Sequence, residues 1–307
     1  MGNPATREQF YRLLEAGLKE VSENQWNDLP SQLPQLYRSI PSTAAWEEFF
    51  SIGSVGDIPA FNGKLEYLTQ APGYLTRIES KTYAAGRIFE RELIEDKKYG
   101  VMSDQVASLT RSAQRTREKL GIEASFAYAF STAHLFQYSE EGVALCSDSH
   151  TTKSGASTST GFDNCGTSAF NKTSLAATKL AMRRFRDDIG ERIDLNPDTI
   201  IFPSSIADTV REVVGSDKDP DSANNTINVQ YGKWKLIEIP RLDDYDPNNW
   251  FVVDSREMKR HLLMIDRVPK ETNTTIDFET FAAKWSIRFR VAFGFKEWRF
   301  VYGHQVS

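Results

Sequence analysis

The sequence predicts an α+β fold, in which helices and strands occupy largely separate stretches of the chain. Residues 102–131 place apolar side chains at helical spacing, which predicts one long helix. Residues 199–215 combine a short strand with a helix after Pro203. Beyond residue 226 the pattern is nearly all strand, so the C-terminal part is expected to be rich in sheet.

Length and composition are typical of a folded protein that does not read nucleic acid. The 307 residues are 40% apolar, enough to bury a core. The net charge of −5 lacks the Lys/Arg excess that phosphate binding favours. We find no run of ~18 apolar residues and no apolar leader, so we expect neither a membrane span nor a secretory signal. Two cysteines fit a reducing compartment.

The N-terminal sixty residues predict a helix followed by an apolar arm. Apolar residues recur at helical spacing over residues 5–22, which predicts an amphipathic helix. Residues 23–60 lose this period because prolines interrupt any long element. The stretch is still rich in Trp, Phe and Leu, unlike a disordered tail. We therefore expect it to lie on another surface, either its own body or a neighbouring subunit.

Residues 61–90 predict two strands joined by a turn at Pro72 and Gly73. The flanking segments LEYLTQ and YLTRIESKTY both mix apolar and charged residues. An isolated two-stranded hairpin is at best marginally stable in water, so we expect something else to pack against this one.

The strongest helical pattern runs from Met102 to Ser131. Its basic side chains, including Arg111 and Arg115, are expected to form a solvated face. Gly121 interrupts the pattern at a cost of about 1 kcal/mol relative to Ala, and we expect a kink there.

The remaining chain is expected to alternate loops with short elements. Residues 150–170 are rich in Ser, Thr and Gly and predict a loop, and a helix is expected over 174–186. In the unit at 197–215, Ser204 or Ser205 is the expected N-cap and Gly215 the C-terminal stop. Strands are then predicted for the segments TINVQY, KWKLIEI, WFVVD, RHLLMI, TTIDFE and KWSIRFRVAFGF.

Cys146, His150 and Cys165, with His134 nearby, are the residues most typical of a chemical site. They could hold zinc, but no tight Cys-x2-4-Cys pair is present. Cys146 and His150 could also be a thiol nucleophile and its base, but no third orienting group or known signature accompanies them. A partly buried thiol beside a polar histidine is the favoured interpretation.

The acidic cluster Asp243, Asp244 and Asp246 could hold a divalent cation, although a solvated turn is favoured. Neither of the two glycine-rich phosphate-binding motifs, G-x-G-x-x-G and G-x-x-x-x-G-K-S/T, occurs in the sequence. The sequence thus predicts no catalytic residue, no cofactor and no metal, and we expect the protein not to be an enzyme.

The order of segments resembles the major capsid proteins of tailed bacteriophages with the Hong Kong 97-type fold, and among them the Mu-like major head subunit (gpT-like) group. The resemblance covers the chain from about Pro59 to Gly303. The resemblance rests on these segments: GRIFERELIEDKKYG (86–100), ALCSDSH (144–150), the segment 173–216, the Asn224-Asn225 loop, KLIEIPRLDD (235–244), NNWFVVD (248–254) and FRVAFGFKEWRFVYG (289–303).

The resemblance implies a division of the chain into four parts. Residues 1–58 would be an N-terminal arm, and residues 59–88 an extended hairpin loop that overlaps an adjacent subunit. Residues 89–160 and 251–307 would form the peripheral domain, whose spine is the long helix. Residues 161–250 would form the axial domain around the five-fold and six-fold axes.

The function implied is that of a major head protein, which self-assembles as pentamers and hexamers into an icosahedral shell around double-stranded DNA. The main partners would be copies of itself, with a separate scaffolding protein, a portal, room for a decoration protein, DNA bound without sequence specificity, and no membrane. The protein would assemble in the host bacterial cytoplasm and reside in the virion.

The residues expected at subunit interfaces all lie in the arm and the hairpin. They are Phe10, Leu14, Leu18, Trp26, Trp46, Phe50, Tyr67, Tyr74, Arg77 and Glu79. Two alternatives stay open at this point. One is an encapsulin-type nanocompartment shell with a protein cargo, and the other is a Cys/His metal- or thiol-dependent hydrolase.

Overall fold

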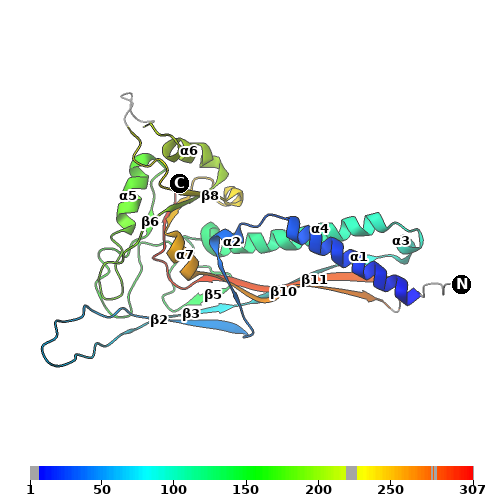
Figure 1. Ribbon diagram of the computed structural model, residues 1–307, viewed down its shortest axis with the longest axis horizontal. Helices are drawn as coiled ribbons and strands as arrows, with labels where there is room; N and C mark the ends of the chain where they lie inside the picture. Colours follow the sequence, from blue (N-terminus) through cyan, green and yellow to red (C-terminus); the bar gives the residue numbers. More distant parts are fainter. Residues whose placement is uncertain (1–6, 219–226, 278, 280–281, 307) are drawn as a thin grey trace.

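The computed structural model describes residues 7–218, 227–277, 279 and 282–306, without the side chains of residues 7–14 and Ile94. Figure 1 shows an elongated part, in which helices lie along long strands, and a second body that rises from one end of it. An extended loop leaves the molecule below the second body. The described strands form three sheets.

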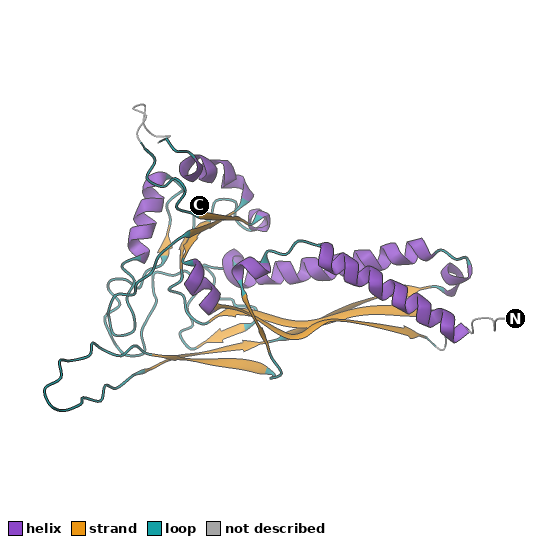
Figure 2. Ribbon diagram, viewed as in Figure 1, coloured by secondary structure: helices purple, strands orange, loops and turns teal. Residues whose placement is uncertain are grey.

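A four-stranded sheet forms the base of the elongated part, in the order β1-β10-β11-β4. Its strands are β1 (Arg38–Pro41), β10 (Leu262–Ile276), β11 (Ala283–Phe295) and β4 (Lys81–Phe89). The two longest strands, β10 and β11, are antiparallel neighbours, and helices cover one side of the sheet (Figure 2). Most side chains of β11 are buried, which makes this strand the centre of the core.

The predicted long helix is confirmed as α4 (Tyr99–Ile122), which follows the short helix α3 (Arg91–Glu95) and continues as a π-helical turn, η1 (Glu123–Ala127). Its apolar stripe, including Met102 and Val106, is fully buried, whereas Arg111 and Arg115 are exposed as expected.

The N-terminal helix extends beyond the predicted residues 5–22. Helix α1 (Arg7–Asp28) and helix α2 (Leu33–Leu36) both lie on the chain's own body. Leu18 is buried, and the Ser22 hydroxyl lies 2.9 Å from that of Thr110 in α4. The arm was expected to lie either on its own body or on a neighbouring subunit, and residues 15–37 lie on their own body.

The predicted hairpin at residues 61–90 is wrong in its pairing. No strand forms at residues 61–70, and the turn residue Pro72 begins a strand, where a missing backbone N–H is tolerated. Strand β3 (Pro72–Glu79) pairs with β2 (Trp46–Ile52) and β5 (Gln137–Ser139) in a three-stranded sheet. Strand β4 pairs instead with β11, because that partner offers a long antiparallel edge.

The second body contains a five-stranded sheet in the order β6-β12-β9-β7-β8. Its strands are β6 (Cys165–Gly166), β12 (Val301–His304), β9 (Trp250–Val253), β7 (Thr199–Phe202) and β8 (Lys235–Glu238). The other elements are α5 (Lys172–Met182), η2 (Ser204–Ile206), α6 (Ala207–Gly215), η3 (Pro240–Asp244) and α7 (Ser255–His261). A boundary at residue 251 would cut through β9, so this sheet groups residues 250–253 and 301–304 with the second body.

Of the predicted strands, TINVQY does not form and RHLLMI begins later than expected, because polar side chains hold the backbone differently. In TINVQY, the Asn228 amide donates to the carbonyl oxygens of Val213 and Ser216 at 2.6 and 3.0 Å, so residues 227–231 form no named strand. In the segment RHLLMI, the first residues belong to α7, whose N-terminus is capped by the Asp254 carboxylate. The strand β10 begins only at Leu262.

Gly121 marks a close approach of three elements and not a break in α4. A Cβ atom at this position would collide with Leu33 of α2 and lie 3.2 Å from Cε1 of Phe293 in β11. The Gly121 carbonyl oxygen accepts hydrogen bonds from the Tyr37 and Ser125 hydroxyls at 2.5 and 3.0 Å. The glycine therefore lets α2 and β11 pack directly on the helix.

We expect Gly121→Ala to destabilise the protein by about 1–3 kcal/mol, the range typical of overpacking a core. Helix propensity alone predicts the opposite sign, a gain of up to about 1 kcal/mol. Gly17→Ala in α1 is the matched control, because none of the side chains that the structure describes lies within 4 Å of the added methyl group. Urea unfolding of both variants checks this, and equal stabilisation by both would contradict the packing argument.

Candidate assembly surfaces

The loop between β2 and β3, residues 53–71 (the hairpin loop), leaves the body as an extended segment (Figure 1). The Gly53 amide donates to the Ala71 carbonyl oxygen at 2.9 Å and closes its base. Every residue from 55 to 70 is exposed. Ile58, Phe61 and Tyr67 are 89, 75 and 91% exposed, so the loop carries an apolar surface that its own chain does not cover.

Strand β2 continues this apolar surface into the body. Its side chains alternate between exposed and half-buried, and Trp46, Phe50 and Ile52 share the exposed face. Phe50 and Ile52 are each more than 70% exposed. Ile52, Ile58, Phe61 and Leu65 were not among the expected interface residues, although apolar side chains beside Pro59 and Gly63 are a signal that could have identified them.

Three of the expected interface residues lie together on the β2–β3 ladder. Trp46 is directly opposite Glu79, and the Arg77 guanidinium lies 4.0 Å from the centre of the Trp46 ring. Arg77 also pairs with Glu79 at 3.5 Å. These groups are largely exposed, so their ion pair contributes little to folding and leaves them accessible to a partner.

The other expected interface residues are scattered. Leu18 is buried in the chain's own core, because α1 packs on α4, and is therefore not accessible to a neighbour in this arrangement. Trp26 is half-buried, and the Tyr74 hydroxyl lies 2.7 Å from that of Thr151. Phe10 and Leu14 belong to α1, but their side chains lie outside the described residues.

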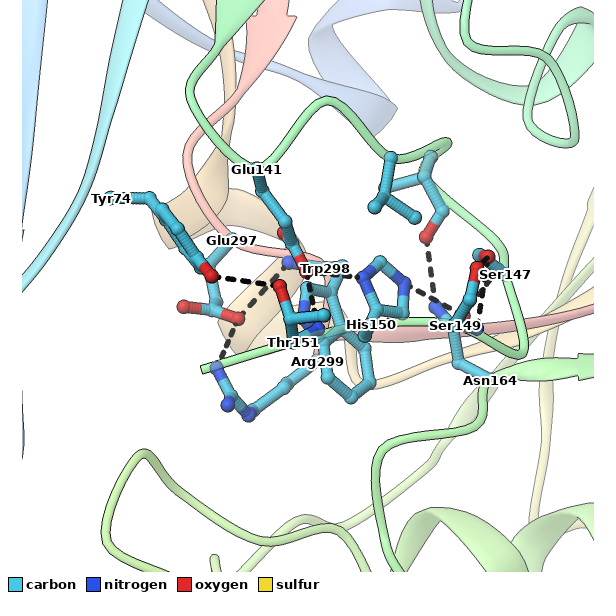
Figure 3. A network of polar contacts seen from close by, with 12 residues as sticks. Tyr74, Glu141, Ser147, Ser149, His150, Thr151, Asn164, Glu297, Trp298 and Arg299 are labelled. Carbon is cyan, nitrogen blue, oxygen red and sulfur yellow. Dashed lines mark hydrogen bonds and ion pairs between the residues drawn. The ribbon is translucent and has the colours of Figure 1, made fainter. Parts of the chain in front are cut away.

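A polar network runs from Tyr74, at the root of the hairpin loop, through Thr151 and Glu141 to His150 (Figure 3). The His150 ring stacks on Trp298 with ring centres 4.0 Å apart, and its nitrogens lie 3.1 Å from oxygens of Glu141 and Asn164. Arg299 is 7% exposed and bonds a carboxylate oxygen of Glu297 at 2.5 Å. These contacts hold in place the loops that support the exposed surfaces.

The cysteine and histidine residues do not form the arrangement of a thiol enzyme. Both ring nitrogens of His150 already face Glu141 and Asn164, so the ring is not directed at a thiol. Burial raises the pKa of the Cys146 thiol well above its ordinary value and, less strongly, that of Cys165, which disfavours a nucleophilic thiolate. Within the described residues, no three His, Cys, Asp or Glu side chains cluster as metal ligands.

Asp243, expected either in a cation site or in a solvated turn, has a structural role. Its carboxylate accepts hydrogen bonds from the backbone amides of Ser204 and Ser205 at 3.1 and 3.0 Å. It thereby satisfies the N-terminus of the η2–α6 segment from a distant part of the chain. The hydroxyl groups of Ser204 and Ser205, which were the expected caps, bond to Glu238 and Asp243.

His304 is a neutral histidine enclosed in the second body. Its ring stacks on Trp250 at 4.1 Å, its Nδ1 accepts a hydrogen bond from the Ser168 amide, and its Nε2 lies 2.7 Å from the Thr178 hydroxyl. Burial lowers the pKa of His304 from 6.5 to about 4. The neutral ring is thus part of the packing between α5 and β12.

The family model described as "Phage capsid protein" matches residues 74–303 of the chain. The capsid protein of bacteriophage JBD30 is similar in structure, with 16% identity and a TM-score of 0.55 over 70% of this chain and 91% of that one. The capsid protein of Myoviridae phage XM1 has 11% identity and a TM-score of 0.56 over 90 and 91%. That of cyanophage Pam1 has 10% and 0.55 over 89 and 91%.

These structural likenesses are at low identity and speak for the fold alone. No protein with a curated description matches this sequence. Among the helices of the described ranges, none combines the length and apolarity that crossing a bilayer requires.

Protonation of His304 should make the protein less stable in mild acid. The unfolded chain binds a proton near pH 6.5, whereas the folded chain does so only near pH 4, so stability falls as pH decreases between these values. The loss should approach about 3 kcal/mol at pH 4, since one pKa unit corresponds to about 1.4 kcal/mol.

Urea unfolding of the wild type and of His304→Gln at several pH values measures this contribution. The variant should be less stable at pH 7, and the difference in unfolding free energy should shrink as the pH falls to 4. A difference that stays constant over this range would contradict the assignment to His304.

Proposed function

This chain belongs to the phage capsid protein family, and from that membership we infer that it is a major capsid protein whose copies build an icosahedral shell. Its fold is of the Hong Kong 97 type. As a capsid protein it is a component of the virion. The observation that carries the assembly proposal is the apolar hairpin loop, which only another molecule can cover.

Covering the hairpin loop supplies a driving force for assembly. Each 100 Å² of apolar surface removed from water contributes roughly 2.5 kcal/mol before ordering costs. Exposed apolar side chains recur along the loop and on the exposed face of β2, from Trp46 to Leu68. We propose that this surface lies on an adjacent subunit, with Trp46, Phe50, Tyr67, Arg77 and Glu79 in the contact.

The four-part division of the chain is proposed with two adjustments. The peripheral domain corresponds to the elongated part with α4 as its spine, and the axial domain to the body around the five-stranded sheet. Strands β9 and β12 join the axial domain because they pair within that sheet. The extended hairpin becomes β2, the hairpin loop and β3, so the arm is shorter than residues 1–58.

The partners beyond the chain itself follow from the shell. We propose pentamers and hexamers as the assembly units, formed in the bacterial cytoplasm around a separate scaffolding protein and a portal, with double-stranded DNA as the packaged cargo and room for a decoration protein. The Mu-like group is proposed on the segments from 86 to 303 that carry that resemblance.

Two other functions are less well supported. A nanocompartment shell would use the same fold with a protein cargo, and an enzyme that co-purifies inside DNA-free particles would favour it. A Cys/His-dependent hydrolase is disfavoured because burial raises the pKa of both thiols and because His150 is engaged with Glu141 and Asn164. We therefore propose a structural, non-enzymatic role.

Replacing Ile58, Phe61 and Tyr67 together by Ser should abolish shell formation, because it removes the largest exposed apolar side chains of the hairpin loop. The monomer should keep its stability within about 0.5 kcal/mol, since surface substitutions away from packed contacts change little. Negative-stain electron microscopy of the expressed full chain, alone and with a scaffolding protein, gives the readout.

Asn62→Ser with Gln70→Ser is the matched control, because both residues are exposed polar positions of the same loop. This control should assemble like the wild type. Normal shells from the triple Ser variant would contradict the role proposed for the loop.

Replacing Cys146 and Cys165 by Ala should leave assembly intact, because neither thiol takes part in a shell contact or in chemistry under this proposal. The wild type and the double variant should yield particles in equal amount. Loss of particles from a double variant that retains its circular dichroism spectrum would revive a function for the thiols.

A further inference from the structure

The C-terminal end of α5 forms one wall of a groove rich in arginine. The groove has a volume of about 610 Å³ and is lined by Arg183, Arg184 and Arg192. All three side chains are exposed, and none pairs with a carboxylate of the described residues. Asp194 is the one carboxylate in the lining. We call this surface the arginine groove.

Apolar groups accompany the positive charge. Leu180 lines the arginine groove and is 50% exposed, and Ile193 beside it is half-buried. A polyanion such as DNA would neutralise the guanidinium groups but offers phosphates, not apolar side chains, to Leu180. A protein segment with carboxylates and aliphatic groups complements both features, so the groove favours a protein partner.

The same chain displays a matching negative surface on α6. The carboxylates of Asp208 and Glu212 are exposed, and that of Asp208 is fully in water. Asp208 reaches Arg211 only at 3.9 Å, and Glu212 pairs with no described residue. Asp244 lies beside the start of this helix, because its neighbour Asp243 caps Ser204 and Ser205. We call Asp208, Glu212 and Asp244 the acidic face.

The two surfaces lie on different sides of the second body. Figure 1 shows α5 on one flank and α6 across the sheet from it, near β8. A contact between two different surfaces of identical chains is heterologous, and such contacts close into rings when the rotation between copies allows it. An isologous dimer contact uses one and the same patch on both copies, so two surfaces on different sides of the body cannot meet in it.

We propose that the arginine groove of one copy binds the acidic face of the next, and that this contact joins second bodies side by side into rings. This inference rests on the proposed shell function and identifies the residues that make the ring contact. Each copy then contributes one groove and one acidic face, so every contact in the ring pairs opposite charges.

Charge reversal in the full chain tests the proposal. Arg183→Glu with Arg184→Glu should abolish rings and shells at concentrations where the wild type assembles completely, and so should Asp208→Arg with Glu212→Arg. The variant with all four substitutions should assemble again, because the attraction is restored with reversed sign. Arg183→Lys with Arg184→Lys keeps the charge and should assemble. Sedimentation velocity and negative-stain microscopy measure the products.

A mixture of the two reversed variants sharpens the test. Each variant has a groove and a helix of the same sign, so copies can pair only with the other variant. Alternation closes a ring with an even number of members, so the mixture should recover hexamers and not pentamers.

The possible outcomes distinguish a failure of the proposed shell function from a failure of the proposed ring contact. If the wild type forms neither rings nor shells, even with a scaffolding protein, the proposed function fails. If the wild type and the Arg183/Arg184 reversal assemble equally well, the ring contact is wrong while the shell stands. If the variant with all four substitutions also fails to assemble, the acidic face is not the partner of the groove. If the Arg183/Arg184 reversal loses only DNA binding, the groove binds DNA instead.

Discussion

The layers of the fold are positioned by the close packing around Phe293 and Gly294 in β11. The Phe293 ring lies 5.2 Å from that of Tyr37 and touches the bare backbone of α4, so the N-terminal segment, the long helix and the central sheet meet there. One residue further, a Cβ at Gly294 would lie 2.7 Å from Ile78 and Gln137. The side chains of Ile78 and Gln137 in the three-stranded sheet, which carries the hairpin loop, therefore pack directly against the backbone of β11.

Polar and apolar side chains have different roles in this architecture. Inside, polar side chains form hydrogen bonds with backbone groups of distant segments. Asp243 accepts a hydrogen bond from a backbone amide at the start of η2, and Asn228 donates one to a carbonyl oxygen near the end of α6. Outside, large apolar side chains such as Phe61 and Tyr67 remain in water. A chain that leaves large apolar side chains uncovered at its periphery is suited to repeat contacts with copies of itself, because each new copy covers what the last one exposes.

The two intersubunit contacts that we propose differ in physical character. The hairpin loop offers apolar area, whose burial is strong but non-directional. The arginine groove and the acidic face of α6 offer complementary charge, which adds less free energy but sets orientation and partner choice. A shell needs both, since adhesion without orientation gives aggregates and orientation without adhesion gives weak complexes.

The long helix and the strand-rich C-terminal part could be predicted from the sequence, because helical periodicity in α4 and alternation in β11 are local signals. The order of segments also sufficed for the resemblance to tailed-phage capsid proteins. It also pointed to an apolar N-terminal region with uncovered aromatic residues. The folded arrangement was needed to learn that Leu18 is buried while Phe61 is exposed, that β3 pairs with β2 and β4 with β11, and that the arginines near α5 gather around one groove. These outcomes depend on which segments meet in space, and contacts between separate segments leave no periodic trace in the sequence.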